Sequence, residues 1–201
     1  MLLDAAEKIV ARCGPDALSV RAVATECGVS TRAVYSVYGS KEAMIAALGN
    51  RAFAALAAAI RALPMTSDPM GDVVATGVDG FRRVMAAWPA LFAIGIQSSG
   101  VDDTARAAYL PAADEAFELL LARVARLKAA GRLPHHEVHE AAVQFHALCE
   151  GLAALELRKL TRCAPEDEEW RARWTQALRA LLVGFRVAEV DSAGRGPVVR
   201  A

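Results

Sequence analysis

A short helix with a polar face, predicted over residues 31–38, carries the side chains whose chemistry is most informative. The residues expected to face inward are Ala33, Val34 and either Val37 or Tyr38. Those left to face solvent are Thr31, Arg32, Tyr35 and Ser36. Hydroxyl and guanidinium groups form hydrogen bonds with base edges and phosphates, and an α-helix fits the major groove of DNA. This pattern indicates a helix that reads duplex DNA.

The elements that must position this helix have clear boundary signals. Ser19 is expected to cap a helix over residues 20–27, and Gly28 to end it in the left-handed conformation. Ser30 would then cap the reading helix, and Ser40 the helix that begins at Lys41. Two short helices joined by such a turn form a helix-turn-helix. The predicted DNA-binding residues are Ser19, Ser30, Thr31, Arg32, Tyr35, Ser36 and Lys41.

The run CGVSTRAVYSVYGSKEAM resembles the DNA-binding signature of TetR-family transcriptional regulators. The matching residues are Gly28-Val29-Ser30, Val34-Tyr35, Tyr38 and Ser40-Lys41-Glu42. Two positions depart from the pattern, because Val37 stands where a phosphate-binding His or Tyr is common and Arg32 where a small residue is common. The resemblance implies a three-helix helix-turn-helix domain, a helical ligand-binding and dimerisation domain, and a homodimer that binds double-stranded operator DNA.

Composition favours an all-α chain with a sizeable core. Hydrophobic residues make up 55% of the 201 residues, and runs with strand-like alternation are missing. The formal net charge is zero, so any DNA affinity has to come from a local basic patch. We expect about nine helices in three parts. These are a DNA-binding domain over 1–48, a ligand-binding and dimerisation domain over 49–190, and a flexible tail over 191–201.

The sequence predicts a cytoplasmic protein with reduced thiols. Asp4, Glu7 and Lys8 interrupt the N-terminus, which lacks the pattern of a signal peptide, and no uninterrupted apolar stretch of about 20 residues follows. The cysteines are Cys13, Cys27, Cys149 and Cys163, and they form no CxxC pair. We expect all but Cys163 to lie on the apolar faces of helices.

In the second domain, prolines and glycines separate the predicted helices. Residues 41–62 form a long alanine-rich helix, and 68–87 a second one that ends before Trp88-Pro89. A short helix over 90–97 and a loop over 98–100 follow. The remaining predicted helices cover 103–130, with a kink at Pro111, then 136–161, and a last helix that begins after the acidic segment 166–169.

Aromatic side chains on neighbouring helical stripes predict an apolar effector site. The candidate pocket residues are Phe81, Met85, Trp88, Phe92, Phe117, Phe145, His146 and Glu150. Apolar walls with few polar groups suit a small hydrophobic or cationic molecule. The same residues also fit a filled hydrophobic core, and the sequence leaves that alternative open.

The last two helices carry more apolar surface than one small bundle can bury. We therefore expect a symmetric dimer, with an interface formed by Leu152, Leu155, Trp174, Leu178, Leu181, Leu182 and Phe185. An intramolecular core is the alternative. The segment 145–157 is also similar to a TetR subfamily with a Trp, then His-Gly, then Leu-x-x-Leu; here Gly151 and the leucines match, but His146 and Glu150 replace the Trp and His.

The chain shows no pattern typical of an enzyme, and it implies no cofactor. The one metal-like cluster is His135, His136, Glu137, His139 and Glu140. A solvated polar helix entry is the favoured interpretation, so no metal is predicted. We expect a transcriptional repressor that a small-molecule effector releases from its operator. The alternatives are an all-α enzyme or carrier that uses the helix-turn-helix as scaffold, and a DNA-binding module that senses no ligand.

Overall fold

A computed structural model describes residues 1–89, 92, 103–158 and 167–186. Within these ranges every regular element is helical and there is no strand, which confirms the predicted all-α class. The predicted loop over 98–100, the tail over 191–201 and Cys163 lie outside the described residues, as does the predicted short helix over 90–97 except for Phe92.

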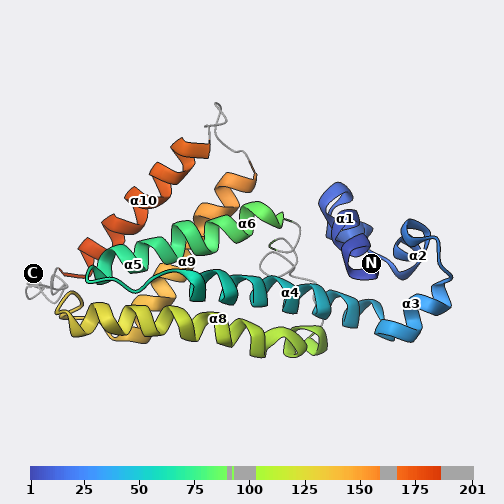
Figure 1. Ribbon diagram of the computed structural model, residues 1–201, viewed down its shortest axis with the longest axis horizontal. Coiled ribbons are helices and arrows are strands. Elements are labelled where there is room, and N and C mark those ends of the chain that lie inside the picture. The colour runs from blue at the N-terminus through green and yellow to red at the C-terminus, as the bar shows by residue number, and fades with distance from the viewer. Residues whose placement is uncertain (90–91, 93–102, 159–166, 187–201) are drawn as a thin grey trace, which may run out of the picture.

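Three short helices gather at one end of the molecule (Figure 1). They are α1 (Leu2–Cys13), α2 (Val20–Cys27) and α3 (Thr31–Tyr38), with a 3₁₀ turn over Pro15–Ala17 between the first two. Their buried side chains form a small core that also includes the first two turns of the next helix. Its members include Ala6, Ile9, Leu18, Val23, Val34, Met44 and Leu48.

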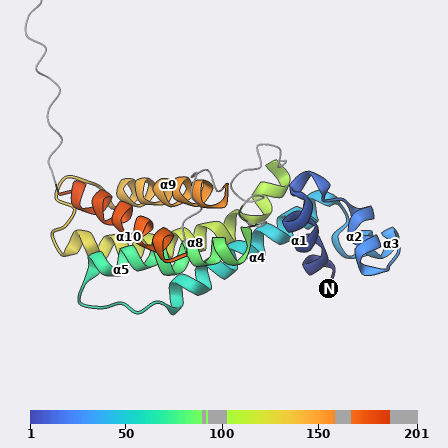
Figure 2. The same ribbon diagram turned by 90° about the horizontal axis from the view of Figure 1, so that it is seen from above.

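Helix α4 (Lys41–Ala62) leaves this domain and runs along the molecule beside α8 (Asp103–Ala129), as both views show (Figures 1 and 2). The two helices approach closely because Gly49 has no side chain, since a Cβ there would lie 2.8 Å from Tyr109 Cδ1. By length and hydropathy α4 could span a membrane. The apolar character of α4 is equally explained by its packing against α8 and α1.

The predicted helix over 68–87 forms, but its middle is a π-helix. It consists of α5 (Pro69–Ala75), the π-helical segment η2 (Thr76–Arg82) and α6 (Arg83–Ala87). A Cβ on Gly77 would lie 2.5 Å from Leu178 Cδ1, so the glycine lets the next layer pack against this segment. Hydrophobic spacing does not distinguish a short π-helical segment from an α-helix, so the sequence did not predict the π-helix.

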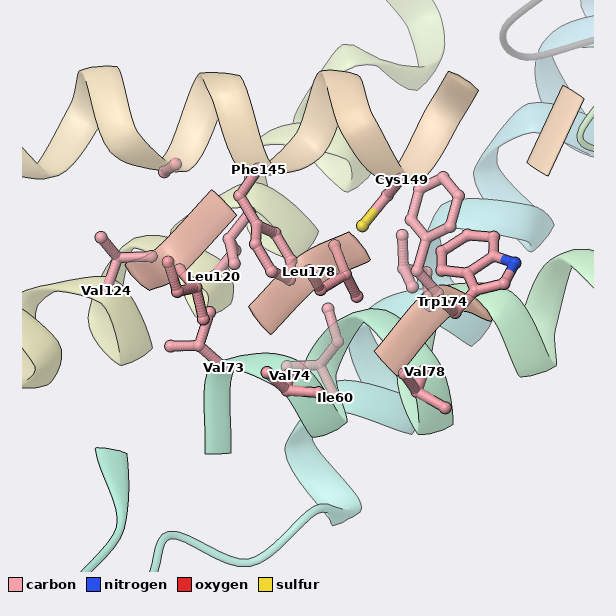
Figure 3. Close-up of a cluster of buried hydrophobic side chains, with 14 of the residues drawn as sticks. Ile60, Val73, Val74, Val78, Leu120, Val124, Phe145, Cys149, Trp174 and Leu178 are labelled. Atoms are coloured by element: carbon pink, nitrogen blue, oxygen red, sulfur yellow. The ribbon is translucent and has the colours of Figure 1, made fainter. Parts of the chain in front are cut away.

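Helices α9 (Val138–Leu157) and α10 (Asp167–Gly184) lie beside each other and cover α5 and η2 (Figure 2). Figure 3 shows the resulting core, where Phe145 and Cys149 of α9 meet Trp174 and Leu178 of α10. Helix α9 begins at Val138, two residues after the predicted start at 136, so His135 and His136 lie in the preceding turn.

One of the three described cysteines differs from the prediction that each lies on an apolar helix face. Cys149 is buried and Cys27 is half-buried, but Cys13 is exposed. The buried face of α1 ends at Val10, so the last turn of that helix has no neighbour to cover it. The expectation of a buried Cys13 was wrong for that reason.

Candidate nucleic-acid interface and effector cavity

Three serine caps fix where the helices of the DNA-binding domain begin. Each hydroxyl oxygen accepts a hydrogen bond from the backbone N–H three residues later, which is the geometry of an N-cap. The pairs are Ser19 with Ala22 at 3.1 Å, Ser30 with Ala33 at 3.2 Å, and Ser40 with Ala43 at 3.0 Å. The start of α2, α3 and α4 was therefore predicted correctly, and the hydroxyls of Ser19 and Ser30 act in positioning.

The turn between α2 and α3 is closed by Gly28 and Val29. Gly28 adopts the left-handed conformation, with φ 65° and ψ 31°, which a residue with a side chain rarely adopts. The Val29 N–H donates to the Ala24 carbonyl at 2.9 Å, and the Val29 side chain packs against the domain core. This is the predicted tight turn of a helix-turn-helix.

Helix α3 presents a polar face to solvent. Its predicted outward residues Thr31, Arg32, Tyr35 and Ser36 are all exposed. The predicted choice between Val37 and Tyr38 is resolved, because Tyr38 packs against the core and Val37 is 61% exposed. The Ser36 hydroxyl donates to the Ala33 carbonyl at 2.8 Å, which leaves its lone pairs free to accept.

Ion pairs divide the basic residues of this domain into two groups. Arg12 bonds Glu26 at 2.9 Å and lowers the pKa of that carboxyl, while Arg51 bonds Asp4 at 2.5 Å. Among the described residues, Lys8, Arg21, Arg32 and Lys41 form no salt bridge. Positive charge is therefore available locally on α2, on α3 and at the start of α4, although the net charge of the chain is zero.

A cavity of about 210 Å³ lies in the second domain between α4, η2, α8 and α9. Four of the predicted pocket residues line it, namely Phe81, Phe117, Phe145 and His146. The other lining residues are Phe53, Leu56, Ile60, Thr76, Ala113, Asp114, Ala116, Leu120 and Cys149. The α4 wall was missed because alanine surrounds its large residues, so the spacing did not show which face meets α8.

The other predicted pocket residues do not line the cavity. Met85 is buried in the domain core, and Phe92 packs edge-on against Phe81 with ring centroids 5.8 Å apart. Glu150 pairs with His146 instead, at 2.9 Å. Trp88 packs against the core of the DNA-binding domain. Helix α6 therefore ends at the junction between the two domains.

The polar groups that line the cavity are mostly engaged with protein partners. His146 Nε2 bonds Glu150, and its ring meets Phe81 and Phe117 edge-on at centroid distances of 5.7 and 6.1 Å. The Thr76 hydroxyl donates to the Asp72 carbonyl at 2.9 Å. Burial raises the pKa of the Cys149 thiol, which keeps it neutral.

Four of the predicted interface residues belong to the core of the single chain. Trp174, Leu178, Leu182 and Phe185 are at most 3% exposed, because α10 covers α9 and η2 within one protomer. We therefore reassign these four residues from the predicted dimer interface to the interior of the chain. Leu152 and Leu181 are half-buried, and Leu155 is 47% exposed. Helical spacing gives the buried face but not the identity of the neighbour that buries it.

A buried arginine ties the ends of these helices to the π-helix. Arg82 of η2 bonds Glu156 of α9 at 2.8 Å and Asp167 of α10 at 2.5 Å. The Trp174 indole N–H donates to the other oxygen of Glu156 at 2.8 Å. The buried guanidinium of Arg82 and the indole N–H of Trp174 thus both have hydrogen-bond partners, and the network holds α10 against α9 and η2.

Two histidines of the predicted cluster pack against different aromatic side chains. Within the described residues, no group of three or more His, Cys, Asp or Glu side chains could hold a metal ion. His136 packs against the ring of Phe185 at 4.8 Å, and His139 meets Phe117 edge-on at 5.7 Å.

The chain thus combines a helix-turn-helix domain with a second all-α domain, and the long helix α4 joins the two. Residues 2–48 match the family described as "Bacterial regulatory proteins, tetR family". The match covers helices α1 to α3 and the start of α4, so the N-terminal domain is similar to the DNA-binding domain of that family. No curated protein sequence matched it significantly.

Solved structures share the fold over almost the whole chain. A TetR family transcriptional regulator, PfmR from Thermus thermophilus, is 19% identical with a TM-score of 0.71, covering 90% of this chain and 96% of that one. A tetR-family bacterial regulatory protein from Rhodococcus is 17% identical with a TM-score of 0.73, covering 90% and 94%. The fatty acid degradation regulator FadR from Bacillus halodurans is 15% identical with a TM-score of 0.73, covering 91% and 96%.

Proposed function

We propose that the protein is a homodimeric repressor that binds a palindromic operator through α3 and is released by a small-molecule effector in the cavity. The observation that carries this proposal is the α4 wall of the cavity. Phe53, Leu56 and Ile60 line the cavity, while Met44 and Leu48 of the same helix are buried in the core of the DNA-binding domain. One rigid helix thus spans the place where an effector would bind and the place where DNA would bind.

DNA would be read by α3 and held by its neighbours. The exposed Arg32 and Thr31 suit base edges, whereas Lys41, at the first position of α4, suits a phosphate. Two copies of α3 in one dimer would enter successive major grooves about 34–36 Å apart. The operator would then be a palindrome with half-sites one helical turn apart.

The dimer would form through the exposed face of α9. Val143, Ala147, Gly151 and Leu155 follow at four-residue steps, so they share one face of the helix, and each is exposed. No atom lies within 4 Å of a Cβ placed on Gly151, so a second helix could approach closely there. An exposed apolar helix face marks a protein contact, and the TetR resemblance implies dimerisation through the two C-terminal helices.

The far end of α4 is fixed to the effector domain. The buried Arg123 of α8 donates to the carbonyls of Ile60 at 2.9 Å and Leu63 at 2.8 Å, where the helix ends. Arg126 holds Asp72 of α5 at 2.6 Å. With that end anchored, an effector that displaces the cavity wall would move the free end of α4, which carries Lys41 and packs against the DNA-binding domain.

Trp88 provides a second connection. It follows α6 directly and packs against the core of the DNA-binding domain, while Phe81 lines the cavity two helical turns earlier. A shift of the π-helix would therefore reach the DNA-binding domain without passing through α4.

The test begins with selection of bound duplexes from random DNA, followed by fluorescence anisotropy of the selected operator during titration with small molecules. Release requires differential binding of only about 1–3 kcal/mol, and DNA must then weaken effector binding by the same factor. An operator with two half-sites and an effector that obeys this reciprocity would support the proposal. Equal effector affinity with and without operator would exclude allosteric release.

The size of the cavity favours one competing function. At about 210 Å³ it is smaller than the range of about 300–1,000 Å³ typical of drug-sized ligands. If operator binding proved insensitive to every small apolar compound tested, a DNA-binding module without ligand sensing would be the better description.

A further inference from the structure

We infer that the cavity selects a cationic ligand, whose charge is recognised by Asp114 at the rim. This inference rests on the proposed effector site and names the chemical class that the site would take. Asp114 lies on α8, lines the cavity and is exposed. It is one turn before Phe117, so a ligand packed on that ring would place a positive group near the carboxylate.

The charges around the cavity are negative or already paired. None of the described residues that line it is a lysine or arginine. The described part of the chain gives Asp114 no salt-bridge partner, although its neighbour Glu115 pairs with Arg61. His146 of the lining already pairs with Glu150 at 2.9 Å. A bound cation would therefore be the complement that the lining lacks.

The walls add a second source of attraction for a cation. Phenyl rings reach the cavity from four separate elements, through Phe53 of α4, Phe81 of η2, Phe117 of α8 and Phe145 of α9. The face of an aromatic ring carries negative charge density and attracts an ammonium group, more strongly where water is excluded. Carboxylate and rings together suit an organic cation with an apolar body.

An anionic ligand does not fit the same lining. Its carboxylate would lose hydration without gaining a basic partner, and it would approach the like charge of Asp114. The Thr76 hydroxyl already donates to a backbone carbonyl, and the Cys149 thiol is neutral, so neither balances a negative charge. A neutral ligand would fill the apolar walls but gain nothing from Asp114.

The experiment compares probes of matched shape on the full chain by isothermal titration calorimetry. Benzyltrimethylammonium and neopentylbenzene have the same skeleton and differ in charge, and phenylacetate supplies an anion. We expect the cation to bind at least about tenfold more tightly than the neutral probe, and Asp114→Asn to reduce that preference about three- to tenfold. Glu118→Gln is the matched control, because Glu118 is an exposed carboxylate one turn further on α8 and does not line the cavity.

Several results would overturn the inference. They are failure of the cation to bind, equal affinity for the cation and its neutral isostere, or a preference that Asp114→Asn leaves unchanged or Glu118→Gln lowers equally. Operator release is measured separately, so that the two proposals can fail independently. Cation binding without release would contradict the proposed function alone. Release by neutral or anionic compounds, unaffected by Asp114→Asn, would contradict the cation selectivity alone.

Discussion

Replacing Gly77 by alanine tests whether α10 packs inside the chain, as the structure has it, or is free to form the predicted dimer interface. In the structure, the new Cβ would lie 2.5 Å from Leu178 Cδ1, 3.0 Å from Phe145 Cζ and 3.3 Å from Cys149 Sγ. All three neighbours are at most 1% exposed, so none can swing into solvent to make room. The methyl group must therefore displace packed atoms.

The expected magnitude follows from two opposing effects. Adding a methyl group to a packed core typically costs about 1–3 kcal/mol. Alanine in place of glycine within a helix contributes about 0.5–1 kcal/mol through lower chain entropy in the unfolded state. We therefore expect Gly77→Ala to lower the free energy of unfolding by up to about 2.5 kcal/mol.

Gly80→Ala is the matched control in the same π-helix. It brings the same gain from chain entropy, but its Cβ would lie 3.2 Å from Ile60 Cγ1, which needs a shift of only a few tenths of an ångström. Urea unfolding at one fixed protein concentration measures both variants, because the proposed dimerisation would make apparent stability concentration-dependent. Gly77→Ala should be the less stable of the two.

A second substitution removes the clashing methyl groups. Leu178→Ala alone should cost about 2–5 kcal/mol as a cavity in the core. The double variant should be more stable than the sum of the two single free-energy changes predicts, by at least about 0.5 kcal/mol. Free-energy changes of substitutions at residues in contact are generally not additive. If Gly77→Ala were as stable as Gly80→Ala and additive with Leu178→Ala, then α10 would not pack here and Leu178 would again be a candidate for the dimer interface.

Three further predictions concern function. Leu155→Glu should give monomers in sedimentation velocity and a parallel loss of operator affinity; a variant that stays dimeric would remove α9 from the interface. Arg32→Ala should relax preference at one base position at a cost of about 1–3 kcal/mol, whereas Lys41→Ala should weaken all sequences alike and reduce the salt slope by about one. Uniform loss for Arg32→Ala would make Arg32 a phosphate contact. Trp88→Ala should keep operator affinity within about threefold but lower effector-induced release by at least about fivefold, since typical coupling is 5–150-fold. Unchanged release would exclude the Trp88 connection.

The DNA-binding domain was predictable because its signals are local. Ser30 caps α3 and Gly28 closes the turn before it through interactions that span at most five residues of sequence. A short stretch of sequence therefore contains both partners of each interaction. The exposed face of α3 followed from the same few residues, as did the burial of Val34.

The second domain was less predictable because its contacts are distant in sequence. The periodicity of α10 correctly marked Trp174 and Leu178 as apolar and buried, but the neighbours that bury them are α9 and η2 of the same protomer. Trp88 directly follows α6, yet it packs against the core of the DNA-binding domain. Such assignments depend on how the helices are arranged, which hydrophobic spacing does not encode.

The measurement that tests the central proposal most directly is operator affinity as a function of half-site spacing. Inserting five base pairs at the centre of the selected palindrome turns one half-site to the opposite face of the duplex. Loss of the second contact should then weaken binding by at least about 100-fold, since linked binding typically gains 10²–10⁴-fold. Inserting ten base pairs should return the second half-site to the same face of the duplex, but one helical turn farther from the first. A response that stays flat across these spacings would contradict paired reading by two α3 helices.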